Sequence, residues 1–201
     1  MVNKHPDVLA EAIGLGSISW RSPLENDDYA EYRDGAFLER LGCSQLKLPL
    51  AEFWPNMGPQ WDALGRTQAG ELVLVEAKAN LPELLSSPSG AGPDSATRIR
   101  VSLEETANAI GATPGTDWSS RFYQYANRLA HAHFLNHRNS IPTRLVFLYF
   151  IGDADVGGPE SRREWEAAIV VLHEALGIRG RVPTYVSDAF IDVRGALPVV
   201  V

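Results

Sequence analysis

The sequence is poor in cysteine and in long apolar runs. Cys43 is the only cysteine among the 201 residues, so no intrachain disulfide can form and a reducing compartment, the cytoplasm, is expected. No apolar run approaches the roughly 20 residues that a membrane-spanning helix needs. The start of the chain also has no apolar stretch of the signal-peptide kind. We therefore expect a cytoplasmic protein that has no membrane partner.

Positive charge is scarce as well. The formal net charge is -7, and only three of the 18 basic residues are lysines, namely Lys4, Lys47 and Lys78. Proteins that bind nucleic acid through charge usually carry a basic surface. A nucleic-acid partner would therefore require a local arginine cluster, because arginine is the better phosphate clamp, or a substrate other than duplex DNA.

The length and the 45% apolar content fit one domain over residues 1–201 with a full hydrophobic core. The clearest predicted strands cover 71–78 and 143–151, and their near-continuous apolar runs indicate strands that are buried on both faces. The order of elements predicts an α/β fold with a mixed central sheet and helices on both faces, a core at 27–151, and a C-terminal helix and strand within 161–193. The other predicted elements are helices at 27–41, 96–110, 118–136 and 161–176, and strands at 46–54, 60–66 and 183–193.

Three polar residues are predicted to share one side of a hairpin. The turn between the strands is Gln68-Ala69-Gly70, and a three-residue loop favours glycine at its last position. This loop pairs Thr67 with Glu71 and places Asp62 opposite Glu76, with Cβ atoms about 5 Å apart on the same side. Lys78 lies two residues beyond Glu76 and faces that side too. A two-residue loop would instead pair Asp62 with Ala77 and separate the three groups.

Two carboxylates held this close repel each other unless a cation compensates them. Mg²⁺ is suited to the position because it takes oxygen ligands and keeps several waters. A lysine beside the ion can orient a metal-bound water or offset charge on a phosphate oxygen. Asp62, Glu76 and Lys78 therefore predict metal-dependent hydrolysis of a phosphodiester.

The run Gly58-Pro59-Gln60-Trp61-Asp62, followed by thirteen residues and then Glu76-Ala77-Lys78, resembles the signature of the PD-(D/E)XK nuclease superfamily. The resemblance implies a restriction-endonuclease-like core made of a helix, a three-strand meander, a helix and a further strand. It also implies that Asp62 and Glu76 bind Mg²⁺ or Mn²⁺ and that Lys78 positions the attacking water. The proline departs from the pattern, since in the family it often stands directly before the aspartate.

Many members of this superfamily also carry a metal-facing glutamate on the first helix. In some small members it stands eleven residues before the glycine that ends that helix. Glu31 has this spacing from Gly42, so the resemblance assigns it to the site, with Glu39 as the rival.

The predicted helix at 118–136 has two stripes. Trp118, Phe122, Tyr125 and Leu129 form its apolar stripe, and Arg121, Gln124, Arg128 and His131 form an adjacent polar stripe. We expect Arg121, Gln124 and Arg128 to bind substrate by facing a phosphate backbone. RecB-like members of the superfamily carry a glutamine and then a tyrosine on this helix. Gln124 fits the first, but Arg128 stands where the tyrosine usually is.

The sequence thus predicts a Mg²⁺-dependent nuclease acting on DNA. The alternative is a catalytically inactive nuclease-fold module that binds nucleic acid or protein, and a hydrolase of a small phosphorylated substrate is a third interpretation. Strand type, sequence preference, endo- or exonucleolytic mode and pathway stay open. The oligomeric state is open between a monomer and a homodimer, although the apolar tail at 197–201 must be buried somewhere.

Overall fold

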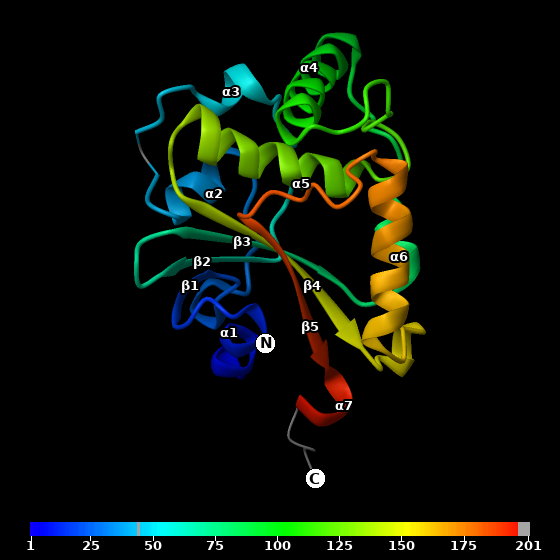
Figure 1. Ribbon diagram of the computed structural model, residues 1–201. Coiled ribbons are helices and arrows are strands. Elements are labelled where there is room, and N and C mark those ends of the chain that lie inside the picture. The colour runs from blue at the N-terminus through cyan, green and yellow to red at the C-terminus, as the bar shows by residue number, and fades with distance from the viewer. Residues whose placement is uncertain (44, 197–201) are drawn as a thin grey trace.

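The computed structural model describes residues 1–43 and 45–196 and contains a five-stranded mixed sheet. The strands lie in the sheet in the order of the sequence (Figure 1). The first three form an antiparallel meander, and the last three run parallel to one another. The strands are β1 (Ile18–Ser22), β2 (Ala63–Thr67), β3 (Leu72–Lys78), β4 (Thr143–Ile151) and β5 (Val186–Asp192).

The helices differ widely in length. None of those in the described ranges is both long and apolar enough to cross a bilayer. Single 3₁₀ turns occur at Glu25–Asp27, Leu81–Leu84 and Ala154–Val156, and a π-helical turn, Phe134–Arg138, extends α5. The α-helices are α1 (Pro6–Ile13), α2 (Asp34–Arg40), α3 (Leu50–Phe53), α4 (Pro93–Ile110), α5 (Tyr123–His133), α6 (Arg162–Ala175) and α7 (Val193–Ala196).

Helices cover both faces of the sheet. Because side chains alternate along a strand, Val73 and Val75 of β3 pack in the cluster that contains Leu9 of α1. Leu72 and Leu74 pack in the larger cluster on the opposite face, beneath α2, α4, α5 and α6. The predicted α/β class, with a mixed sheet between helices, is therefore confirmed.

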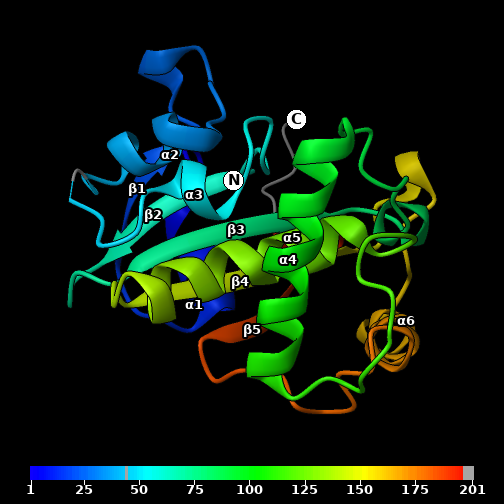
Figure 2. The ribbon, with the colours of Figure 1, turned by 90° about the horizontal axis from the view of Figure 1, so that it is seen from above.

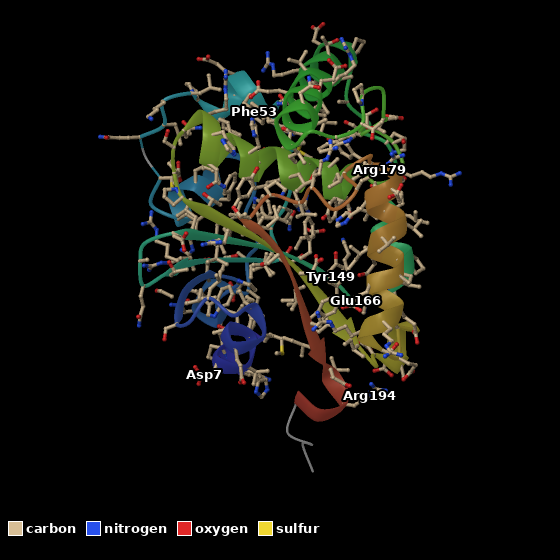
Figure 3. All side chains as sticks on the ribbon, in the orientation of Figure 1. Asp7, Phe53, Tyr149, Glu166, Arg179 and Arg194 are labelled. Carbon is tan, nitrogen blue, oxygen red and sulfur yellow. The ribbon has the colours of Figure 1, made fainter. Side chains whose placement is uncertain are left out.

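Helix α5 is the inner helix of the larger layer. Seen from above, it runs along the sheet while α4 crosses over its outer side (Figure 2). It contacts both β4 and α4, so every residue from Tyr125 to His133 is buried. Tyr149 of β4 lies in the same layer nearer to α6 (Figure 3), where its ring centroid is 4.8 Å from that of Trp165. From Tyr125 onward, a side chain on any face of α5 therefore meets protein rather than solvent.

Several predicted elements match the structure. The strands predicted at 71–78 and 143–151 become β3 and β4, and the helices predicted at 96–110 and 161–176 become α4 and α6. Gly111, with φ +76°, ends α4 as the left-handed residue that glycine favours. The strands predicted at 60–66 and 183–193 correspond to the shorter β2 and β5.

Other predicted elements are wrong. The helix predicted at 27–41 begins only at Asp34, because Asp28 and Tyr29 adopt left-handed backbone and Tyr32 forms a β-bridge to Trp61. The predicted strand at 46–54 contains the helical turn α3 instead. The first strand is β1, and α1 precedes it, in a segment for which the sequence predicts no element. The tail at 197–201 lies outside the described residues.

Candidate active site

The hairpin between β2 and β3 has the predicted register. The Thr67 amide donates to the Glu71 carbonyl at 3.0 Å, and Gly70 occupies the left-handed position at φ +85°. Ala63 pairs with Val75, which places Asp62 next to Glu76 one step outward. The predicted three-residue loop and the register of the paired strand residues are therefore confirmed. Asp62 itself lies one residue before β2 and also borders the cavity on the α1 side of the sheet.

Asp62 is positioned by the loop that leads into β2. The Asp34 carboxylate at the start of α2 accepts from the Met57 and Gly58 amides at 3.1 and 2.8 Å. The Trp61 amide donates to the Tyr32 carbonyl at 3.1 Å, and the Trp61 side chain is completely buried. With this loop fixed, Asp62 Oδ2 accepts from the Ala77 amide of β3 at 2.6 Å.

Glu76 lies at the buried centre of the site. Its side chain is on the face covered by α5, and the residue is 3% exposed. One carboxylate oxygen, Oε1, accepts from Lys78 Nζ at 2.7 Å, and the other, Oε2, accepts from Arg128 Nε at 2.6 Å. Two cations thus compensate one buried carboxylate, as burial of a charge requires.

Arg128 is held in place from several sides. Its Nη1 donates to Asn127 Oδ1 at 2.8 Å, and its Nη2 donates to the Gln60 carbonyl at 2.9 Å. Its guanidinium carbon lies 5.1 Å from the centre of the Trp61 ring, a cation–π distance. This arginine therefore joins α5 to the loop before Asp62 as well as to Glu76.

The polar stripe predicted on this helix needs correction. Arg128 is predicted to face a phosphate backbone, but it is only 6% exposed, because α5 is enclosed by α4 and the sheet. His131, the last residue of the stripe, is 1% exposed for the same reason. Burial lowers the pKa of His131 to about 3, so its imidazole is neutral. Gln124 does reach the site, where its Oε1 accepts from Lys78 Nζ at 3.1 Å. Arg121 is exposed and precedes α5, which begins five residues later than expected.

Glu31 also approaches Asp62, although it is not on a helix. It lies in the extended segment before α2, where its Oε2 accepts from Gln60 Nε2 at 3.0 Å. Its negative charge contributes to the raised pKa of Asp62. Its rival Glu39 is on α2, and the hydrogen bonds and ion pairs described for this chain do not join it to Asp62 or Glu76.

The pKa of Asp62 is raised from an ordinary 3.8 to about 6. Burial is the main cause, and the neighbouring charge of Glu76 adds to it. The Ala77 amide and Arg128 act in the opposite direction without cancelling the effect. The folded protein therefore stabilises the charged form of Asp62 less than water does.

This shift predicts a pH-dependent stability. A raised folded-state pKa gives a stabilising contribution that is complete below pH 3.8 and is lost as the pH rises through about 6. Between pH 4 and pH 7.5 the free energy of unfolding of the wild type should fall by about 2 kcal/mol more than that of Asp62→Asn. Urea unfolding of both proteins at the two pH values measures this, and parallel pH profiles would contradict the assignment.

The chemistry of the donor set fits a hard divalent cation. Mg²⁺ is commonly bound through one or two carboxylates, with water and substrate phosphate completing its shell, and Asp62 and Glu76 supply two. No group of three or more His, Cys, Asp or Glu side chains that could hold a metal occurs in the described ranges. A cation held by Asp62 and Glu76 would relieve the repulsion that raises the Asp62 pKa.

The sequence did not reveal every residue that shapes this site. Gln60, Trp61 and Asn127 hold Arg128, and Glu83 accepts from the Ala79 amide at 2.8 Å just beyond β3. A cavity of about 10 Å³ beside Glu76, Lys78 and Glu83 has room for about one water. The contacts of Gln60, Trp61 and Asn127 with Arg128 could be anticipated only once Arg128 is known to lie on the buried side of α5.

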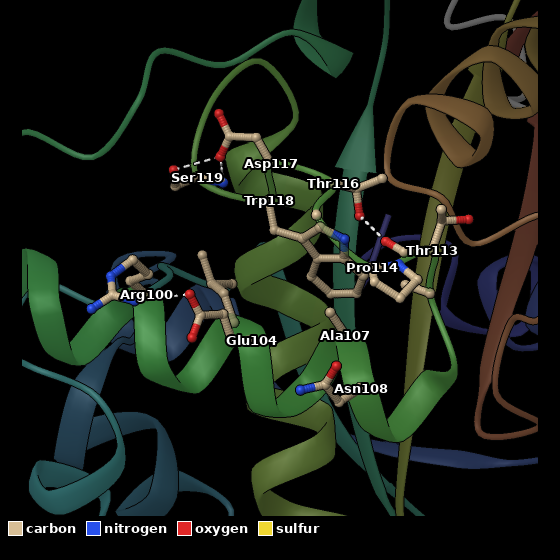
Figure 4. A pocket seen from close by; sticks show the side chains of 13 residues that line it. Arg100, Glu104, Ala107, Asn108, Thr113, Pro114, Thr116, Asp117, Trp118 and Ser119 are labelled. Carbon is tan, nitrogen blue, oxygen red and sulfur yellow. Dashed lines mark hydrogen bonds and ion pairs between the residues drawn. The ribbon is translucent and has the colours of Figure 1, made fainter.

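A separate hollow of about 420 Å³ lies between α4 and the segment at 112–119 (Figure 4). Its charged groups are paired within it. Arg100 contacts Glu104 at 2.9 Å, and the Asp117 carboxylate accepts from the Ser119 amide at 2.8 Å. We assign it no chemical role.

Comparison with protein-family models, curated proteins and solved structures found no match to this chain.

Proposed function

We propose that this chain is a Mg²⁺- or Mn²⁺-dependent nuclease of the PD-(D/E)XK kind that hydrolyses phosphodiester bonds in DNA. The observation that carries the proposal is the position of Asp62 beside Glu76, with Lys78 on the Glu76 carboxylate. The element order supports it. Helix α1, the meander β1–β2–β3, helices α4 and α5, and then β4 resemble the order of the family core, with α1 in place of the helix expected at 27–41 and with α2 and α3 inserted between β1 and β2.

In this proposal Asp62 and Glu76 hold the cation, with Glu31 near enough to assist through Asp62. When bound, the ion polarises the phosphate and lowers the pKa of the attacking water. The Asp62 carboxylate is charged above about pH 6, its pKa, so the site is ready for a cation at neutral pH. Arg128 fixes the Glu76 carboxylate through Oε2, while Oε1 accepts from Lys78.

Lys78 has a part of its own in this proposal. Its ammonium group donates to both Glu76 Oε1 of β3 and Gln124 Oε1 of α5. The strand and the helix therefore fix its direction together. From this position it can donate to a phosphate oxygen or orient the attacking water. Gln124 then acts as a positioning residue for Lys78, and exposed Arg121 before α5 is a contact for the phosphate backbone. We place this activity in the cytoplasm.

A second candidate function is a binding module without turnover. The observation that favours it is the neutralisation of Glu76 by the two cations Lys78 and Arg128, at 2.7 and 2.6 Å. Such a site would be stable as it stands and would bind nucleic acid or protein through its surface. The two candidates differ in whether a divalent cation enters the site.

The deciding assay is cleavage of labelled single-stranded and duplex DNA by the purified full chain. The nuclease proposal predicts cleavage with Mg²⁺ or Mn²⁺ that EDTA abolishes and fresh Mn²⁺ restores. Binding of DNA without cleavage under any of these conditions would favour the binding module. Cleavage that survives EDTA would contradict the role given to Asp62 and Glu76.

A further inference from the structure

Asp62 borders a second cavity, on the face of the sheet opposite Glu76. This cavity of about 440 Å³ lies between α1 and the sheet and is named here the α1-side pocket. Its volume is within the range of small-ligand sites. Its floor consists of apolar side chains from β2, β3 and β4, namely Ala63, Val75, Ala77, Leu148 and Phe150.

The walls of the pocket are held by specific contacts. Asn3 Nδ2 donates to the Pro23 carbonyl at 2.9 Å, and the Glu25 amide donates to Asn3 Oδ1 at 3.0 Å. The Tyr29 amide donates to the Leu24 carbonyl at 2.9 Å. The segment before α1 and the loop after β1 are thereby tied together around the opening.

Three rim residues indicate what the pocket would bind. Tyr29 is 51% exposed and, with Asp28, adopts left-handed backbone at φ +57° and +47°. Such strained non-glycine residues are concentrated at functional sites, and an exposed aromatic ring is a platform on which a base can stack. Lys4 adds a positive charge to the rim. Asp62 lines the pocket and also belongs to the candidate active site.

We propose that the α1-side pocket holds an unpaired nucleobase of a single-stranded DNA substrate. An apolar floor and an aromatic wall suit a flat base, whereas a base in a duplex would first have to leave its stack. The net charge of -7 also disfavours the broad electrostatic contact that duplex binding needs. This inference rests on the proposed nuclease function and adds to it the strand type and the contact that selects it.

The test is binding of a fluorescein-labelled single-stranded oligothymidylate, measured by anisotropy in EDTA so that no cleavage occurs. The wild type should bind the single strand at least tenfold more tightly than a matched duplex. Ala77→Leu, which fills the floor, and Tyr29→Ser, which removes the stacking platform, should each weaken this binding about tenfold. Val171→Ser, an exposed apolar residue on α6, is the matched control and should bind as the wild type does.

Each opposite outcome is informative. Equal binding by the wild type, Tyr29→Ser and Ala77→Leu would overturn the pocket assignment, and equal affinity for duplex would overturn the strand type. If thymidine monophosphate competes as well as the oligonucleotide does, the ligand of the pocket is a free nucleotide. That result would overturn the proposal that the pocket holds a base of a DNA strand. Cleavage with Mn²⁺ is scored separately. Variant-sensitive binding without cleavage would support the pocket and contradict the nuclease proposal.

Discussion

Replacing Arg128 with methionine is expected to lower the free energy of unfolding by about 3 kcal/mol. Methionine keeps much of the packing volume but leaves the buried Glu76 carboxylate with Lys78 as its one cation partner among the described contacts. It also removes the donors that satisfy Asn127 and the Gln60 carbonyl. For a domain of this length such a loss lowers Tm by roughly 6–12 °C. Urea unfolding and thermal scans at pH 7.5 measure it.

A surface ion pair supplies the control for this prediction. Arg100→Met breaks a pair with Glu104 in which both side chains are about 60% exposed, and it should cost less than about 1 kcal/mol. Adding Glu76→Gln to Arg128→Met should restore part of the loss, because the buried charge is then gone. An Arg128→Met protein as stable as Arg100→Met would show that the ion pair at Glu76 does not hold the site.

The second large effect is expected on catalysis. Asp62→Asn should reduce the rate of metal-dependent DNA cleavage roughly 10³-fold, because metal-ion catalysis contributes several kcal/mol to lowering the barrier. The same variant should be more stable than the wild type at pH 7.5, since it lacks the carboxylate that is unfavourable there. Loss of activity together with a gain of stability separates a catalytic role from a folding role.

Asp155→Asn is the matched control for this substitution. Asp155 is an exposed aspartate in the turn after β4. The Asp155→Asn protein should therefore cleave DNA at the wild-type rate and unfold with the wild-type free energy. Initial rates with Mn²⁺ and urea unfolding of the three proteins complete the comparison. Cleavage by Asp62→Asn at the wild-type rate would remove Asp62 from the mechanism.

The sequence predicted the hairpin that carries the site because its signals are local. A three-residue loop ending in Gly70 fixes the register between β2 and β3. That register brings Asp62, one residue before β2, near Glu76, and the contacts of the preceding loop complete its placement. The apolar runs of β3 and β4 were equally clear, because both strands are covered on both faces.

The parts that failed depend on contacts between distant segments. Tyr32 pairs with Trp61 across the loop before Asp62, and this contact displaced the start of α2 to Asp34. The sequence predicts an exposed side of α5 that includes Arg128 and His131, because a helix with one apolar stripe usually has one face in solvent. The packing of α4 over α5 buried that side as well, and the periodicity of α5 carries no information about α4.

The central claim is that one divalent cation is shared by Asp62 and Glu76. Crystals of the wild type grown with Mn²⁺, with diffraction measured at the manganese edge, test it most directly. We predict a single anomalous peak coordinated by Asp62 and by Oε1 of Glu76, with Lys78 displaced toward solvent or phosphate and Arg128 still on Oε2. Crystals in which Lys78 and Arg128 keep Glu76 between them, with no peak beside Asp62, would contradict the account.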